Sequence, residues 1–400
     1  MVAETLGGGG EPSAAGGERV AAAARRAGPA LLLFAGIRGI GVLCVAGWAR
    51  HTGRHPRTLL GASWDSQWYL SIAQHGYGSP AVTRTWPQLP AADLAFFPLY
   101  PWLVRALRAA VPLGAASAGL LVSWAAALAA AWGIFAVGER LHGRRTGVLL
   151  VALWALLPHA VVESMAYTEP LLTALAAWSL YALLTRRPVW AGALAALAGL
   201  ARPSALASVA AVELAVVAVA WRQRRPDGRA GGRVPPGRLW AAALLAPTGW
   251  LAYVLWVGWH TGHGPLGYLD VQALWGSRFD LGRDTLRAVR RLVLTGAPPA
   301  YCMALAVVAV ALLLYALLVA DRPPAAVLGY VTVLVVLALG GTHYFASKPR
   351  FLLPAFPLLL PAARALAGAH RRTTALLCGA LAALSSGYGA YLLTVAAIPL

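Results

Sequence analysis

The sequence predicts an all-α polytopic membrane protein that crosses the bilayer about eleven times. Hydrophobic residues make up 59% of its 400 residues, charged residues only 12%, and the mean hydropathy is +0.65. A soluble fold of this size would leave large apolar patches exposed to water. The composition therefore excludes soluble enzymes and soluble binding domains.

The chain begins with a segment unlike the rest. Residues 1–28 are rich in Gly, Ala and Glu and have no apolar period, which predicts a disordered cytoplasmic tail. The run 29–49 is long enough to span the bilayer and is not followed by a signal-peptide cleavage site. We expect residues 29–400 to form a single transmembrane domain.

Further apolar runs predict the remaining spans. The run 189–221 is interrupted at Arg202-Pro203, and as one helix it would be about 50 Å long, too long for a hydrocarbon core of about 30 Å. Two shorter helices are therefore expected there. The other predicted spans are 115–137, 147–164, 169–185, 239–259, 298–320, 324–341, 350–366 and 373–396.

Basic residues set the predicted topology. The net charge is +19, and the basic residues are arginines except for Lys348. They cluster in short turns, at 140–145, 186–187 and 222–238, as cytoplasmic loops do. No soluble domain carries a concentrated basic surface, so a nucleic acid is not expected as a partner. The turns share the side of the N-terminus only if the run 95–108 lies flat as an interfacial helix, which we predict.

With this topology, the polar residues collect on the extracytoplasmic side. A first outer loop covers 51–114, with interfacial helices, and a second large one covers 260–297. Carboxylates, aromatic residues and cations reach this side from five separate loops. Such convergence favours a chemical site over a purely structural role.

Asp65 is the carboxylate predicted to act as a general base. In a helix from residue 64 to 77 it would share a face with Tyr69, near Trp64, at the membrane surface. The alternative is that Asp65 caps a helix N-terminus. Asp93 lies in the same outer loop and is a further candidate for the substrate pocket.

Glu169 and three cations complete the predicted site. Glu169 is a second catalytic candidate, with helix N-terminal stabilisation as its alternative. Arg202, Lys348 and Arg350 are predicted to bind a phosphate, with snorkelling from helix ends as the alternative. Tyr167 adjoins Glu169 and is a pocket candidate.

Other polar residues have simpler interpretations. Arg38 lies within an apolar run, as does Glu213, and the two are predicted to pair with each other. His260, His263 and Asp270 have metal-ligand chemistry but no supporting pattern, so they are taken as loop residues. No metal site is assigned.

Several segments, taken in order, carry a family resemblance. They are Trp64-Asp65-Ser66, Ile72-Ala73 with Gly76-Tyr77, AFFPLYP at 95–101, Tyr167-Thr168-Glu169, Leu200-Ala201-Arg202-Pro203, Gln272 with Trp275, and RFLLPAFP at 350–357. This set resembles the PIG-V family, the second mannosyltransferases of GPI-anchor synthesis and their bacterial relatives. The family belongs to the C-type glycosyltransferases (GT-C).

The resemblance implies an inverting transfer of a sugar, mannose in the family, from a polyprenyl-phosphate donor to an extracytoplasmic lipid or glycan acceptor. It makes Asp65 the base and Glu169 the second acidic position, with donor-phosphate contacts at Arg202, Lys348 and Arg350. Gln272 and Trp275 join the substrate pocket. The sequence departs from the family at Arg202-Pro203-Ser204, which replaces Arg-Ser-Asn-Gly, and at residues 64–66, which hold one carboxylate. The acceptor and a requirement for a divalent cation therefore stay open.

Two rival functions remain. A lipid or solute transporter would place ionisable groups near the bilayer midplane and often carries inverted repeats. A lipid-linked glycan polymerase or ligase would bind a lipid phosphate but use a glycan donor.

Overall fold

The structure is a computed structural model that describes residues 12–79, 91–224, 234–296 and 298–396. In these ranges every named element is a helix, and one isolated β-bridge joins Phe279 to Gly341. The helices in these ranges that are long and apolar enough to cross a membrane are Ala21–His51, Ala115–His142, Pro203–Arg224, Pro236–Thr261, Pro299–Ala320 and Arg371–Thr394. The prediction of an all-α membrane protein is confirmed for the described part of the chain.

The predicted count of eleven spans is not confirmed. Three of the predicted spans form apolar helices of only 12 to 16 residues: α8 (Glu169–Leu184), α9 (Pro188–Gly199) and α16 (Ala325–Gly340). The run 350–366 is a helix pair bent by 82°, with prolines at 354 and 357 that cannot continue a helical ladder. The run 147–164 is α7 (Arg144–Ala155) followed by the 3-10 turn η2 (Ala160–Ser164).

The predicted break at residue 202 is present. Helix α9 ends at Gly199, the turn η3 (Pro203–Ala205) follows, and α10 (Leu206–Arg224) begins directly after it. Proline disfavours helical geometry in the residue before it, and Arg202 is accordingly extended, with φ −159° and ψ 154°. The break therefore turns the Arg202 side chain out of a helical register.

Small residues bring the central helices close together. Helix α6 (Ala115–His142) packs between α7 and α8. A Cβ atom added at Gly138 would lie 2.8 Å from the Cα of Gly147 on α7, so the two backbones touch. Trp154 of α7 is fully buried and stacks on Phe34 of α1 (Pro12–His51), with 5.4 Å between ring centroids.

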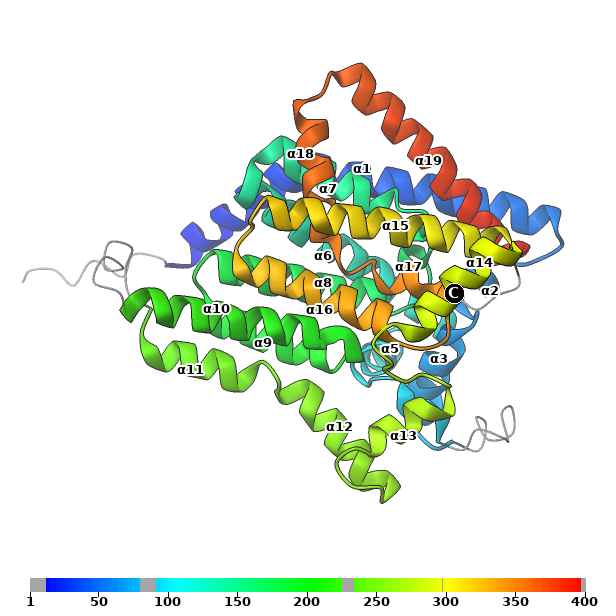
Figure 1. Ribbon diagram of the computed structural model, residues 1–400, viewed down its shortest axis with the longest axis horizontal. Helices are drawn as coiled ribbons and strands as arrows, with labels where there is room; N and C mark the ends of the chain where they lie inside the picture. The colour runs from blue at the N-terminus through cyan, green and yellow to red at the C-terminus, as the bar shows by residue number, and fades with distance from the viewer. Residues whose placement is uncertain (1–11, 80–90, 225–233, 297, 397–400) are drawn as a thin grey trace, which may run out of the picture.

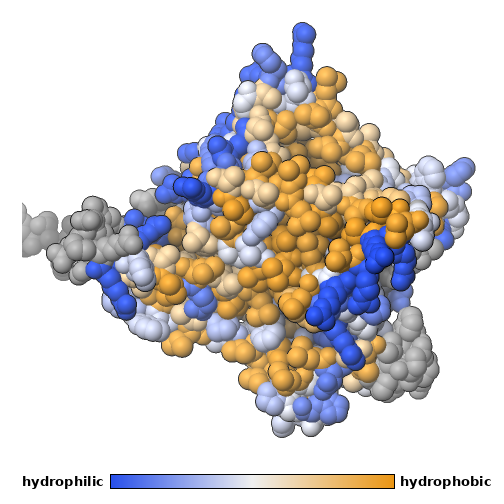
Figure 2. Space-filling model, in the orientation of Figure 1, coloured by the Kyte–Doolittle hydropathy of each residue, from blue (hydrophilic) through white to orange (hydrophobic). Residues whose placement is uncertain are grey.

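The two ends of the bundle differ in chemistry. At one end, called the basic end, Arg26 pairs with Glu139 at 2.8 Å and Arg364 with Asp321 at 2.6 Å. The C-terminal end of α10 and the start of α11 (Pro236–Leu245) lie on the same side (Figure 1). Figure 2 shows an apolar surface across the middle of the molecule, with hydrophilic residues toward its ends and along α14 (Arg283–Thr295).

The opposite end, called the loop end, is built from short helices (Figure 1). They are α2 (Pro56–Gly61), α3 (Asp65–His75), η1 (Ala92–Ala95), α5 (Leu99–Ala110), α13 (Gly267–Leu274), α14 and α17 (Lys348–Phe351). Helix α5 has 12 residues, about 18 Å, so it is too short to cross the hydrocarbon core. This length agrees with the predicted flat helix. Helices α12 (Thr248–Thr261), α15 (Pro299–Ala320), α18 (Leu360–Gly368) and α19 (Arg371–Thr394) complete the bundle.

Two predictions are wrong for this part of the chain. Helix α1 begins at Pro12, so the predicted disordered tail is helical from residue 12 onward, and residues 1–11 lie outside the described residues. Alanine, frequent between residues 21 and 30, is the strongest helix former. Arg38 does not pair with Glu213. Its Nε lies 3.9 Å from Glu163 Oε2 and donates to Ser164 Oγ at 3.2 Å, because η2 points Glu163 into the bundle.

Candidate active site

A cavity of about 770 Å³ opens at the loop end of the bundle. One wall is apolar and comes from α10 and α16, including Leu206, Leu334 and Leu337. The opposite wall carries aromatic side chains of the loops, among them Trp64, Trp68, Phe96, Tyr268 and Trp275. Charged residues from distant parts of the sequence line the cavity between these walls, at Asp65, Arg202, Arg278, Lys348 and Arg350. Such a cavity fits an amphiphile with a polar head.

Asp65 enters the cavity from the start of α3. Trp64 before it has φ 49°, in the left-handed region, so the chain turns sharply into the helix. Asp65 is the first helical residue, and its Oδ2 accepts a hydrogen bond from Arg350 Nη1 at 2.8 Å. The carboxylate is one quarter exposed. It is therefore ion-paired and still accessible from the cavity, which favours the chemical interpretation over helix capping.

Glu169 lies behind the cavity wall rather than in it. It opens α8, directly before Pro170, and its side chain is 1% exposed. Its Oε1 lies 2.8 Å from Arg202 Nη1 and 3.2 Å from Arg350 Nε. Neither oxygen accepts an aligned hydrogen bond in the described part of the chain, so these contacts are ion pairs. A buried carboxylate is costly unless it is paired, and here two guanidinium groups balance it.

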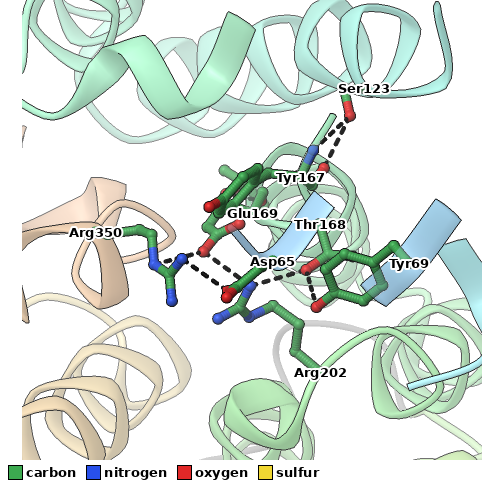
Figure 3. Close-up of polar contacts among 9 residues, drawn as sticks. Asp65, Tyr69, Ser123, Tyr167, Thr168, Glu169, Arg202 and Arg350 are labelled. Atoms are coloured by element: carbon green, nitrogen blue, oxygen red, sulfur yellow. Dashed lines mark hydrogen bonds and ion pairs between the residues drawn. The ribbon is translucent and has the colours of Figure 1, made fainter. Parts of the chain in front are cut away.

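Arg350 lies in the four-residue helix α17 and joins the two acids. Besides the contacts to Asp65 and Glu169, its guanidinium lies over the Tyr167 ring, 5.3 Å from the centroid. Arg202 reaches Glu169 from the other side, and its Nη1 also donates to Thr168 Oγ1 at 2.8 Å. Figure 3 shows both guanidinium groups converging on the carboxylates.

This acid–arginine cluster, formed by Asp65, Glu169, Arg202 and Arg350, contains two negative and two positive charges. In the described chain, the Nη2 groups of both arginines make no hydrogen bond. Each guanidinium can therefore bind a phosphate with its second amino group while the first stays paired.

Lys348 has a different set of contacts. Its Nζ donates to Ala338 O at 2.9 Å and Gly341 O at 2.8 Å, the carbonyls at the C-terminal end of α16. Helix C-termini leave such carbonyls without partners inside the helix. Lys348 lines the cavity, but most of its donor capacity serves the end of α16. A role in phosphate binding stays a prediction.

Thr168 is a functional candidate that sequence reasoning missed. Its Oγ1 accepts from Arg202 and lies 3.0 Å from the Tyr69 hydroxyl. Burial raises the pKa of Tyr69 to about 12, so this hydroxyl stays protonated at neutral pH. Ser123 supports the same segment, since its hydroxyl donates to Tyr167 O and accepts from Tyr167 N (Figure 3). The position of Thr168 between two predicted residues was the available signal.

The remaining pocket predictions divide into two groups. Trp64, Tyr69, Gln272 and Trp275 line the cavity as predicted, whereas Tyr167, like Glu169, lies behind it. Asp93 is not among the residues that line the cavity: it is buried, and its Oδ2 accepts from Gly78 N at 2.7 Å. Burial raises the pKa of Asp93 above its ordinary value.

Among the described residues, no group of three His, Cys, Asp or Glu side chains is placed to hold a metal ion. His263 Nδ1 lies 3.8 Å from Asp270 Oδ2, and both side chains are exposed.

Comparison with known proteins yields only distant similarities. No family profile matches the chain, and no curated relative does either. Solved structures of the Archaeoglobus fulgidus oligosaccharyltransferase are similar: the complex with Zn and sulfate has a TM-score of 0.38 and 16% identity, and the apo form 0.42 and 12%. AglB of the same organism, with an inhibitory peptide and a dolichol-phosphate, has 0.41 and 12%. These matches cover 90% of this chain, which spans about half of theirs (52% to 55%).

Proposed function

We propose that the protein is a membrane glycosyltransferase of the GT-C type. In this proposal it moves a sugar, mannose by resemblance to the PIG-V family, from a polyprenyl-phosphate donor to a lipid or glycan acceptor. The observation that carries the proposal is the pairing of Asp65 with Arg350, which shares Glu169 with Arg202, in a cavity that has one apolar wall. Base, phosphate-binding cations and a surface for a lipid tail are the three elements that this reaction needs.

The proposed chemistry is a single displacement. The acceptor hydroxyl attacks the anomeric carbon, while the bond from that carbon to the phosphate oxygen breaks and its electron pair leaves with the phosphate. Asp65 takes the hydroxyl proton. Attack from the face opposite the leaving group inverts the configuration at the anomeric carbon. Arg202 and Arg350 stabilise the departing phosphate through their unused amino groups.

Charge balance supports this assignment of roles. The donor phosphodiester carries one negative charge, and the released phosphomonoester carries nearly two at neutral pH. The acid–arginine cluster is neutral while Asp65 is ionised and becomes +1 when Asp65 takes the proton. Cluster and lipid phosphate together therefore hold the same total charge before and after transfer. Protonation of Asp65 also releases Arg350 at the moment when the leaving group needs a cation.

The proposed orientation follows from the two ends. Short arginine-rich turns belong in the cytoplasm by the positive-inside bias, so the basic end is assigned to that side with the N-terminus. The cavity at the loop end then faces the extracytoplasmic side, where a polyprenyl tail enters from the bilayer along α16.

The proposal is tested with purified full-length protein in proteoliposomes, radiolabelled polyprenyl-phosphate mannose and lipids extracted from cells. We expect label to appear in a new lipid or glycan product, and none with Asp65→Asn. Movement of the donor across the bilayer without covalent change would instead identify a transporter. Extension of a lipid-linked glycan, without use of the monosaccharide donor, would identify a polymerase or ligase.

A further inference from the structure

A second cavity, of about 810 Å³, lies outside the acid–arginine cluster, between α1, α7 and α19. Figure 1 shows α18 and α19 meeting at a corner that stands away from α7. We call this cavity the α19 groove. Its walls are apolar, with Leu33 and Ile37 from α1, Val148 and Leu156 from α7, and Ala375 and Ala382 from α19.

The groove is open because α19 carries small residues along it. Ala375, Cys378, Gly379 and Ala382 follow one another at helical spacing on the face that lines the groove. A Cβ atom added at Gly379 would meet nothing within 4 Å. An apolar space of this size inside the bilayer is filled by hydrocarbon rather than by water.

One mouth of the groove is strongly basic. Arg144 and Arg145 begin α7, and Arg371 begins α19. Arg145 donates to Ala369 O at 3.0 Å, which ties the two helix starts together. None of the three arginines has a carboxylate within ion-pair distance in the described chain, whereas Arg26 and Arg364 at the same end are paired. Among the described residues, the mouth thus holds three positive charges without a carboxylate partner.

The length of the groove matches one leaflet. From Arg371 to Ala382 the helix rises about 17 Å, and half of the hydrocarbon core is about 15 Å. A ligand with an anionic head at the arginines would therefore extend one acyl chain through the groove to the bilayer centre.

We propose that the α19 groove is a binding site for an anionic phospholipid. The phosphate binds Arg144, Arg145 and Arg371, and one acyl chain lies between α1, α7 and α19. This site lies at the basic end, opposite the acid–arginine cluster, and does not depend on the proposed transferase activity. Its positive charge selects anionic lipids over zwitterionic ones, and its apolar walls select a lipid over a free phosphate.

The test measures lipid binding to the full chain by native mass spectrometry in detergent, with phosphatidylglycerol and phosphatidylcholine of identical acyl chains. We expect clear preference for phosphatidylglycerol. The triple variant Arg144→Ala, Arg145→Ala, Arg371→Ala should weaken its binding about 100-fold, or about 5-fold for each arginine. Arg222→Ala with Arg224→Ala, at the exposed end of α10, is the matched control and should leave it unchanged.

A second variant distinguishes lipid binding inside the groove from electrostatic attraction of the lipid to the surface arginines. Gly379→Leu fills the groove, keeps the three arginines and suits a helix interior. We expect it to abolish the preference for phosphatidylglycerol while thermal unfolding without lipid stays cooperative. Equal binding of phosphatidylcholine, retained binding by Gly379→Leu, or equally tight binding of glycerol phosphate would each overturn the proposal.

Discussion

Replacing Asp65 by Asn keeps the size of the side chain and removes its charge, so it imitates the state after proton transfer. In that state Arg350 Nη1 loses its anionic partner at 2.8 Å, and the acid–arginine cluster changes from neutral to +1. The variant should be unable to take the acceptor proton. It should also bind the product, a polyprenyl phosphate, more tightly than the wild type does.

The size of this gain follows from the contact that is lost. A hydrogen bond between charged groups contributes about 1.5–3 kcal/mol, and Arg350 is only 6% exposed, so solvent compensates little of it. If about 2 kcal/mol is transferred to the phosphate, product affinity rises about 30-fold. The donor carries half the charge, so its gain should be about 5-fold.

Equilibrium binding of polyprenyl phosphate and of the donor to detergent-solubilised protein measures both numbers. Asp65→Glu, which keeps the charge, is the control and should show wild-type product affinity. The reasoning fails if Asp65→Asn binds the product no more tightly than the wild type. It also fails if the variant transfers sugar at the wild-type rate.

Three other substitutions test neighbouring parts of the structure. Glu169→Gln should lower the free energy of unfolding by about 3 kcal/mol, because both guanidinium groups lose a buried partner; an unchanged unfolding midpoint would contradict this. Lys348→Met should lower the free energy of unfolding by about 2 kcal/mol, because two carbonyls at the end of α16 lose their hydrogen-bond partner. The affinity for the polyprenyl-phosphate sugar should change less than about two-fold. A large loss of donor affinity would instead return Lys348 to phosphate binding. Burial raises the pKa of Asp93, so the stability linked to its protonation is complete below its ordinary pKa of 3.8 and is lost as the pH rises through the raised value. Asp93→Asn should remove this component, which unfolding midpoints measured across pH 4 to 8 can detect.

Features encoded locally could be predicted from the sequence. The helix break at Arg202 was predictable from the length of the apolar run and from Pro203. The choice of Asp65 as a site candidate was predictable from its place at the start of a short helix rich in aromatic residues. The interfacial position predicted for α5 comes from the need to keep the arginine-rich turns on one side, and it stays a prediction with which the 12-residue length of α5 agrees. In each case the physical cause lies within a few residues or in a charge pattern.

Features that depend on distant contacts could not be predicted. Arg350 and Asp65 are 285 residues apart, and only the fold reveals that one guanidinium serves both acids. The sequence predicts a span that ends at residue 341, but it does not reveal that Lys348 Nζ donates to the carbonyls of Ala338 and Gly341 at the end of α16. Asp93 looked available because its partner, Gly78 N, is a backbone group with no sequence signal.

Helix α17 is only four residues long, yet Lys348 fixes the end of α16 while Arg350, two residues later, fixes the carboxylates. The same short helix therefore holds both the end of α16, which forms the apolar cavity wall, and the acid–arginine cluster. A substitution that moves the end of α16 to enlarge the cavity would therefore also move Arg350 and its contacts with Asp65 and Glu169. If the cavity binds a sugar donor and an acceptor as proposed, changes for bulkier substrates belong on the wall formed by Trp64 and Trp275, which adjoin α3 and α13.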